Sequence, residues 1–402
     1  MKNQNETPLS NTSTPLMRSN ASLPMAQPPQ TTARSSYSPA KNKGRWESFV
    51  DHLKHLNNKQ KALIVLAISL TLAGAIALFM LFRQEPPPPV PLPAVVEEEV
   101  EEAPTTVQSK LTGLQVSPEV NERQVTGVMI ENSPEARPQA GLREAGLVFE
   151  AVSEGGITRF LALFQDTSSD YVGPIRSVRP YYIDFLMPFD ASVAHVGGSP
   201  QGLADVRALG VKTLTQFDNP GAYRRINTRY APHNMYSSIP ALKEVEKQRG
   251  FNKSEFEGFK RFEEEQKPAT TPPAKNIDFQ ISSALYNVRF EYDKSNNNYK
   301  RFMAGTPHLD DQSGKQITPK VVIAITMNRG VHSNGVHTTY QTTGSGKMHV
   351  FQNGKVTEGT WKKADRSSQF TFQDSEGKDI KLNPGKTWVT IVSAPNAVSY
   401  TP

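Results

Sequence analysis

The 402-residue sequence contains no cysteine. This absence excludes disulfide bonds, thiolate zinc sites, a catalytic cysteine and a lipidated N-terminal cysteine. The signatures of several common chemistries are missing as well, namely the G-x-S-x-G elbow, the H-E-x-x-H zinc helix, the P-loop and the dinucleotide-binding glycine pattern. The sequence therefore predicts no cofactor and no metal site.

A concentrated basic surface is also missing. The formal net charge is +6, but the basic residues are not gathered with aromatic residues into one face. Such a face is the electrostatic footprint of nucleic-acid-binding proteins. We therefore expect a mild basic surface and no nucleic-acid partner.

One long apolar run stands out in the N-terminal quarter. Residues 62–82 read ALIVLAISLTLAGAIALFMLF and carry no charge. As a helix rising about 1.5 Å per residue, this run spans the roughly 30 Å hydrocarbon core of a bilayer. The run follows the basic residues Lys41, Lys43, Arg45, Lys54, Lys59 and Lys61. Only Arg83 follows it before an acidic stretch, so the positive-inside bias predicts a single-pass cell-membrane protein with a cytoplasmic N-terminus.

The segments that flank this helix are polar. Residues 1–44 are rich in Ser, Thr, Asn, Pro and Gln, which predicts a disordered cytoplasmic tail. Residues 45–61 form a juxtamembrane segment with the apolar spacing of an amphipathic helix. Residues 83–110 contain PPPPVPLP and EEEVEE, which predict a stiff, solvated stalk.

Beyond the stalk, the pattern predicts two extracytoplasmic domains. Residues 111–266 alternate strand-like and helix-like segments and predict an α/β or α+β domain, ending in a helical run from Ile239 to about Glu265. Residues 267–276 (KPATTPPAKN) predict a linker. Residues 277–402 contain short alternating runs separated by turn signals, which predict a mostly antiparallel β domain packed on the first.

Charged residues at the ends of predicted strands are the first candidates for a site. Glu154 and Arg159 flank a tight Gly-Gly turn, where they form either an acid, base or ligand-orienting pair or an ordinary turn salt bridge. Arg176, Ser177 and Arg179 follow a predicted strand and precede a helix, an arrangement that suits an oxygen anion. The alternative is that these arginines pair with neighbouring carboxylates such as Asp184.

Two histidines lie in glycine-rich or proline-containing turns. His195 ends an apolar strand, with Ser199 at the start of the next helix, and is either a ligand or base or a core histidine bonded to the backbone. His233 and Asn234 resemble a helix cap, with Asn234 capping the helix ahead. In the β half we interpret His332, His337 and His349 as scattered surface histidines.

Several long motifs resemble one family. EGGITRFLALFQ, GPIRSVRPYYIDF, HVGGSPQG and APHNMY in the first half, and RFMAG, GSGKMHVFQNGKV and LNPGKTWV in the second, resemble the bacterial YerB-like family of unknown function. The match runs from about residue 112 to the end. The resemblance implies N- and C-terminal YerB-like domains and attachment to the membrane, usually as a lipoprotein. This chain departs from that pattern because it has no cysteine and carries an apolar helix instead.

Three functions remain open from the sequence. The first is a membrane-tethered module that binds an anionic or polar cell-envelope ligand, for example a cell-wall glycopeptide, through Arg159, Arg176, Arg179, His195 and His233, with Ser177, Ser199 and Asn234 beside them. The second is an envelope hydrolase or transferase with Glu154 and either His195 or His233 as acid and base. The third is a structural partner in an envelope protein complex.

Overall fold

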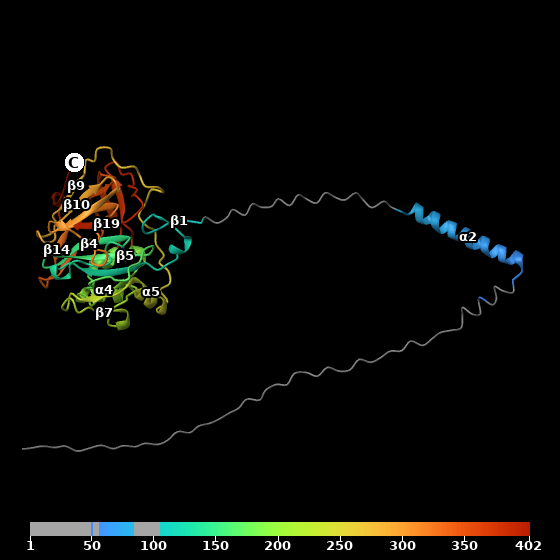
Figure 1. Cartoon of the computed structure of the whole chain (residues 1–402), viewed down its shortest axis with the longest axis horizontal. Coiled ribbons are helices and arrows are strands. Elements are labelled where there is room, and N and C mark those ends of the chain that lie inside the picture. Colours follow the sequence, from blue (N-terminus) through green and yellow to red (C-terminus); the bar gives the residue numbers. More distant parts are fainter. Residues whose placement is uncertain (1–49, 51–55, 84–104) are drawn as a thin grey trace, which may run out of the picture. The chain divides into compact units, whose positions relative to one another are not determined.

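The computed structural model describes residue 50, residues 56–83 and residues 105–402. The chain divides into two units, Met1–Glu99 and Val100–Pro402. The predicted tail (1–44), most of the juxtamembrane segment (45–61) and most of the stalk (83–110) lie outside the described residues. Figure 1 colours the chain from the N-terminus to the C-terminus.

The first unit contributes one described long helix, α2, at Asn58–Leu81. It begins at a capping box in which the side chain of Asn57 accepts from the Gln60 N–H, while the Gln60 side chain accepts from the Asn57 N–H. The hydroxyls of Ser69 and Thr71 donate to carbonyls one turn earlier, which satisfies them within the helix. By length and apolar composition α2 is able to cross a membrane, in agreement with the predicted span of 62–82.

The second unit is built on a nine-stranded mixed sheet. Its strands, in spatial order, are β18 (Thr371–Asp374), β17 (Lys355–Lys363), β16 (Gly344–Gln352), β13 (Val321–Thr326), β19 (Thr387–Val392), β4 (Leu147–Glu154), β5 (Ile157–Phe164), β3 (Thr126–Glu131) and β6 (Ser192–Ala194). The pairs β13–β19, β19–β4 and β3–β6 are parallel and the others antiparallel. The β19–β4 pair joins the two halves of the sequence.

A second, five-stranded antiparallel sheet is formed by the later half. It contains, in order, β12 (Thr306–Pro307), β11 (Asn298–Met303), β10 (Val288–Asp293), β9 (Asn276–Phe279) and β20 (Val398–Thr401). Three two-stranded ribbons complete the strands, namely β1 (Val107–Gln108) with β2 (Gln115–Val116), β7 (Arg224–Arg225) with β8 (Met235–Tyr236), and β14 (Arg329–Val331) with β15 (Thr338–Tyr340).

Three α-helices connect the strands of the first half: α3 (Pro180–Leu186), α4 (Pro200–Ala208) and α5 (Ile239–Gln248). Short 3-10 turns lie at Pro118–Val120, Pro134–Ala136, Met187–Phe189, Pro220–Ala222 and Pro395–Ala397. Ser199 and Ser238 cap α4 and α5 by accepting backbone N–H bonds. Gly210 follows α4 with a φ of +63°, which suits the predicted glycine end of this helix.

The predicted helix from Ile239 to about Glu265 is wrong in its second half. The helix α5 ends at Gln248, and Gly250 follows with a φ of +75°. The chain then runs without helix so that Phe256 and Phe259 reach the core. Burial of these two aromatic rings outweighs the helical preference of the Lys- and Glu-rich segment.

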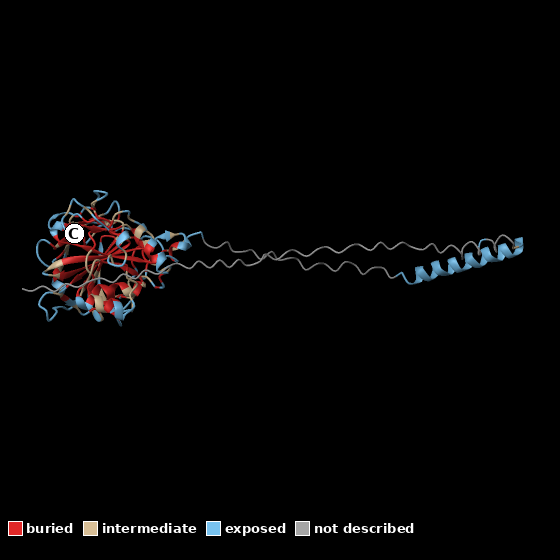
Figure 2. Ribbon diagram, turned by 90° about the horizontal axis from the view of Figure 1, so that it is seen from below, coloured by how far each residue is buried: buried red, intermediate tan, exposed pale blue. Residues whose placement is uncertain are grey.

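Two hydrophobic cores lie on opposite faces of the nine-stranded sheet. Alternate residues of β4 divide between them: Val148 and Val152 join the core that contains the five-stranded sheet and α5, whereas Leu147 and Phe149 join the core that contains α3. In the view of Figure 1, β4 and β5 lie between β9–β10 and α4. Figure 2 shows the buried strands inside an exposed shell of loops and helices.

This architecture differs from two domains packed against each other. Residues 111–266 and 277–402 share one sheet and contribute to both cores. The expected linker, 267–276, is held in place as well, because the N–H groups of Ala269 and Ala274 donate to the carbonyls of Asn353 and Gly354. The mixed α/β character of the first half and the mostly antiparallel character of the second agree with the predicted fold class.

Candidate functional site

Glu154 lies between two of the predicted site arginines. One of its oxygens, Oε1, is 3.0 Å from Arg159 Nη2 and 2.6 Å from Arg179 Nη2, and its other oxygen, Oε2, accepts from Arg179 Nε at 3.0 Å. Nη1 of Arg159 donates to the Ser177 carbonyl and Nη1 of Arg179 donates to the Val178 carbonyl, whereas the buried Arg159 Nε has no partner within the described residues. Both guanidinium groups are buried, and Asp184 pairs with Arg366 rather than with Arg179.

These contacts decide what Glu154 does chemically. Burial opposes ionisation of this carboxyl, but the charges of Arg159 and Arg179 and the hydrogen bonds to it outweigh burial and lower its pKa to about 2. A group with this pKa does not exchange protons near neutral pH. Two guanidinium groups share one carboxylate, so the Glu154 group keeps a net positive charge.

Arg176 and His233 belong to a second group, organised by Glu131 at the end of β3. Glu131 Oε1 is 3.2 Å from Arg176 Nε, and Oε2 is 3.1 Å from His233 Nδ1. Ser133 Oγ also lies 3.1 Å from His233 Nδ1. Both the carboxylate and the hydroxyl thus face the same ring nitrogen, which is not the arrangement of a Ser-His-acid triad.

The sequence reasoning missed Glu131 and Ser133. The available signal was the polar triplet Glu131, Asn132 and Ser133 directly after the apolar run VTGVMI. Polar residues at the end of a buried strand are common at functional sites of α/β sheets.

His195 is a core histidine. Its Nδ1 lies 2.8 Å from the Gly197 carbonyl, which only accepts, so Nδ1 carries the proton. Nε2 then accepts from the Thr213 hydroxyl at 2.8 Å. Burial lowers the pKa of His195. Both ring nitrogens are occupied and the ring is neutral, so the arrangement does not support a role in proton transfer.

The smaller predicted residues have local roles. Ser177 Oγ donates to the Val196 carbonyl, and Ser199 caps α4. Asn234 does not cap the helix ahead, contrary to the prediction, because Ser238 fills that position. The Asn234 side chain instead donates to the carbonyls of Ile226 and Arg229 and closes a turn.

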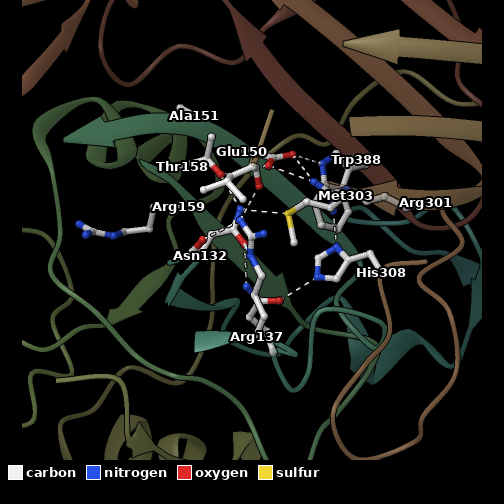
Figure 3. A network of polar contacts seen from close by, with 12 residues as sticks. Asn132, Arg137, Glu150, Ala151, Thr158, Arg159, Arg301, Met303, His308 and Trp388 are labelled. Atoms are coloured by element: carbon white, nitrogen blue, oxygen red, sulfur yellow. Dashed lines mark hydrogen bonds and ion pairs between the residues drawn. The ribbon is translucent and has the colours of Figure 1, made fainter. Parts of the chain in front are cut away.

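A buried polar network links the two halves of the sequence (Figure 3). Arg301 on β11 donates through Nη2 to both oxygens of Glu150 on β4, at 3.0 and 2.8 Å, and both side chains are fully buried. Trp388 Nε1 donates to Glu150 Oε2 at 3.1 Å, and the Arg301 guanidinium lies 4.5 Å from the centre of the Trp388 ring. Figure 3 shows Arg159 pointing away from this network, as expected from the alternation of side chains along β5.

His308 extends the buried network. Its Nδ1 faces Arg301 Nη1, which only donates, so the ring proton lies on Nε2 and is donated to Gln139 Oε1 at 2.8 Å. Burial and the charge of Arg301 hold the pKa of His308 well below its ordinary value. Apart from Arg301 Nε, which has no partner within the described residues, the members of this network bond to one another inside the core, so the network supports the fold rather than a reaction.

A cavity of about 320 Å³ opens between the starts of α3 and α4 and the β14–β15 ribbon. We call it the α3–α4 cavity; its lining includes Tyr181, Asp184, Ser199, Gln201, His332, Asn334 and His337. His332 and His337, which we interpreted as scattered surface residues, therefore lie together. The cavity adjoins the Glu154 group, since Pro180 follows Arg179 and His337 forms a backbone bridge with Glu154.

Asn334 orients both histidines of the cavity. Its backbone N–H donates to His332 Nδ1 at 3.3 Å, and its side-chain amide donates to His337 Nδ1 at 2.7 Å. The amide orientation follows from Asn334 Oδ1, which accepts from the N–H groups of Val336 and His337. Each ring thus accepts at Nδ1, which leaves Nε2–H as its donor for a ligand.

Other polar groups of the cavity are partly committed. Ser199 Oγ accepts from Gly202 N–H, so its own hydroxyl hydrogen remains to be donated. The oxygens of Asp184 accept from Thr342 and Arg366. Gln201 donates its amide to Asp205 and retains its carbonyl oxygen. Among these residues, the two histidines and Ser199 offer donors and Gln201 offers an acceptor. No group of three or more metal-ligating side chains occurs in the described part of the chain.

Comparison with known proteins places the chain in a family. Residues 111–252 match the N-terminal domain, and residues 277–389 the C-terminal domain, of a protein of unknown function (DUF3048). The chain is 30% identical over 305 residues to the Bacillus subtilis protein named "Putative lipoprotein YerB", covering 75% of this chain and 91% of that protein. This chain belongs to the YerB-like family.

The YerB-like fold is supported by an experimental relative. The crystal structure of the YerB protein from Bacillus subtilis matches with a TM-score of 0.67 at 29% identity, and the match covers 74% of this chain and all of that one. The two matched segments begin at residues 111 and 277. Since the family is described as one of unknown function, membership defines the fold and leaves the activity to be argued from the site.

Proposed function

We propose that this YerB-like protein is a membrane-tethered module that binds an anionic cell-envelope ligand outside the cytoplasm, with the anionic group in the α3–α4 cavity. The observation that carries the proposal is the pair of Nε2–H donors of His332 and His337, both oriented by Asn334. The Ser199 hydroxyl adds a third donor. Preoriented donors favour a carboxylate or phosphate oxygen, and the Gln201 carbonyl suits a neighbouring hydroxyl or amide.

The charge beside the cavity supports the same ligand class. Arg159 and Arg179, which the sequence predicted to hold the ligand, do not line the cavity. Both are paired with Glu154 instead. Their shared excess positive charge nevertheless lies one residue from Pro180 of the cavity wall. In a partly buried setting this charge is weakly screened and favours an anion.

The hydrolase or transferase hypothesis has less support. Glu154 is held ionised by two arginines, His195 is neutral and fully bonded, and His233 belongs to the Glu131 group. None of the predicted acid–base pairs is in contact. For Glu154, Arg159 and Arg179 the geometry favours the structural alternative, an internal salt bridge.

Substitution of both cavity histidines tests the proposed function. With the full chain in detergent micelles, His332→Ala combined with His337→Ala is expected to weaken binding of soluble anionic cell-wall glycopeptides at least about tenfold. The reason is that the ligand loses two hydrogen bonds that the histidines donate to its anionic group. Isothermal titration calorimetry measures the affinity. A matched control is Val331→Thr with Val336→Thr, which changes exposed residues of the same ribbon that do not line the cavity. Equal loss in both variants, or no binding by the wild type, would contradict the proposal.

The tether is the second part of the proposal. We propose that α2 spans the membrane once, with the N-terminus in the cytoplasm, and that it replaces the lipid anchor absent from a chain without cysteine. The lack of buried residues on α2 supports this role, because the core helix of a soluble protein buries one face.

Protease accessibility tests this topology. In intact cells stripped of their wall, external protease is expected to digest residues 105–402 and to leave an N-terminal epitope tag protected. Placing three arginines directly after α2 and removing Lys59 and Lys61 weakens the charge bias and should reduce the protected fraction of the tag. Protection of the globular part with digestion of the tag would reverse the proposed orientation.

A further inference from the structure

The α3–α4 cavity is one end of a longer surface feature. We infer that the ligand is an anionic glycan chain with charged groups on successive units, bound along a track from Arg176 and His233 to the cavity. This inference rests on the proposed function, since it takes the cavity as the site of one anionic group. The track consists of residues 176–180 and 196–200, with Phe217 beside them.

The floor of the track is a pair of adjacent backbone segments. Val196 N–H donates to the Arg176 carbonyl at 3.1 Å, Val178 N–H donates to the Gly197 carbonyl at 3.1 Å, and Ser199 N–H donates to the Val178 carbonyl at 3.3 Å. The segments therefore run side by side, and both contain half-exposed residues, including Ser177 and Gly197. Gly197 has a φ of +66° and no side chain, so a ligand can approach the backbone closely at this point.

One end of the track carries donors that the protein does not use. The terminal nitrogens of Arg176 make no hydrogen bond within the described residues, and neither does His233 Nε2. Arg176 Nε and Glu131 Oε2 also lack a hydrogen bond of good geometry in this part of the chain, although both atoms are buried. Arg176 and His233 are held in place by Glu131 and remain a quarter exposed, at 27% and 23%. This arrangement suits an external oxygen anion.

An exposed aromatic ring stands beside the middle of the track. Phe217 is 69% exposed, and its ring carbon lies 4.0 Å from the position that a Cβ at Gly197 would occupy. Burial of a large ring is worth about 1.5–3 kcal/mol, and this ring, which lies beside the glycine of the track floor, offers that surface to a bound ligand. The apolar face of a sugar ring fits such a platform, which is why we infer a glycan rather than a flexible acidic peptide.

The two ends of the track are close enough for neighbouring units of one chain. Arg176 lies five positions before Tyr181 of the cavity, so their Cα atoms are at most about 18 Å apart. A ligand with one anionic group occupies one end only. A chain with several such groups engages both ends and gains from the high effective concentration of its second group.

Comparison of monomeric and oligomeric ligands tests the track. With the full chain in micelles, calorimetry would compare glycerol-free sugar phosphates with phosphodiester-linked sugar oligomers, and galacturonic acid with galacturonate oligomers. The two arms distinguish a phosphate from a carboxylate source. We expect an oligomer of one arm to bind at least about tenfold more tightly than its monomer. Arg176→Gln and Phe217→Ala should each lower the affinity for the oligomer to that for the monomer.

Matched variants separate the track from general surface effects. Arg289→Gln removes an arginine that is paired with a carboxylate on the five-stranded sheet, and Leu114→Ala removes an apolar residue that is 43% exposed between β1 and β2. Neither should change the oligomer gain. Equal affinities for monomer and oligomer, with monomer binding lost in the cavity double variant, would overturn the track and leave the proposed function intact. Absence of binding by every ligand would overturn both.

Discussion

Replacing Glu150 by alanine is expected to lower the free energy of unfolding of the globular part by about 3–5 kcal/mol. The substitution leaves the Arg301 guanidinium charged in a fully buried position, with no carboxylate to balance it. It also removes the acceptor of Trp388 Nε1. Because Glu150 lies on β4 and Arg301 on β11, the loss weakens the contact between the nine-stranded and the five-stranded sheet.

Denaturant unfolding followed by the fluorescence of buried Trp361 and Trp388 measures this effect. A matched control is Asp278→Ala, which breaks the half-exposed pair with Arg289 and should cost no more than about 1 kcal/mol. Replacing Glu150 by leucine together with Arg301→Met should recover much of the loss, since no charge is then left buried. A cost for Glu150→Ala similar to that of the surface control would refute the role assigned to this pair.

Replacing Glu154 by glutamine is expected to lower the free energy of unfolding by the second largest amount, and this loss depends on pH. The pKa of Glu154 falls from 4.5 to about 2 on folding, which corresponds to about 3 kcal/mol of stabilisation at neutral pH. Because the pKa is depressed in the folded state, the stabilisation is present above about pH 4.5. It is lost as the pH falls from there through about 2, since the unfolded chain takes up the proton first.

The measurement is the free energy of unfolding as a function of pH for the wild type and Glu154→Gln. The difference between the two should be near 3 kcal/mol at pH 7 and should shrink steadily below pH 4.5. Glu255→Gln serves as a control, because Glu255 is 71% exposed. A difference that is independent of pH would mean that Glu154 acts through packing rather than through charge.

The local elements of this protein are predictable from sequence because their signals are local. The apolar runs around Val148 and Val389 are strands, and the run of residues 62–82 lies in the helix α2. A serine cap and a glycine end also bound α4 as expected. The pairing of Arg159 with Glu154 could be foreseen, because a tight turn brings neighbouring strand ends together.

The alternatives left open for the site needed longer-range information. Arg179 reaches Glu154 rather than Asp184, and His233 joins Glu131 from a hundred residues away. The two cavity histidines are placed by a turn centred on Asn334. The spacing of residues in the sequence does not reveal that this turn lies beside the starts of α3 and α4. Side chains with similar local patterns thus became core, ion pair or cavity wall according to what packed against them.

By itself, the sequence determined the family, the apolar helix, most strands and the short helices, because hydrophobic period, caps and turn residues act over a few positions. Only the tertiary structure decided that the two halves form one sheet through β19 and β4, that Glu150 meets Arg301 in the core, and that His195 is neutral and fully bonded. Strand partners, burial and side-chain contacts depend on how segments far apart in the sequence pack together. A local hydrophobic period does not specify which distant segments meet.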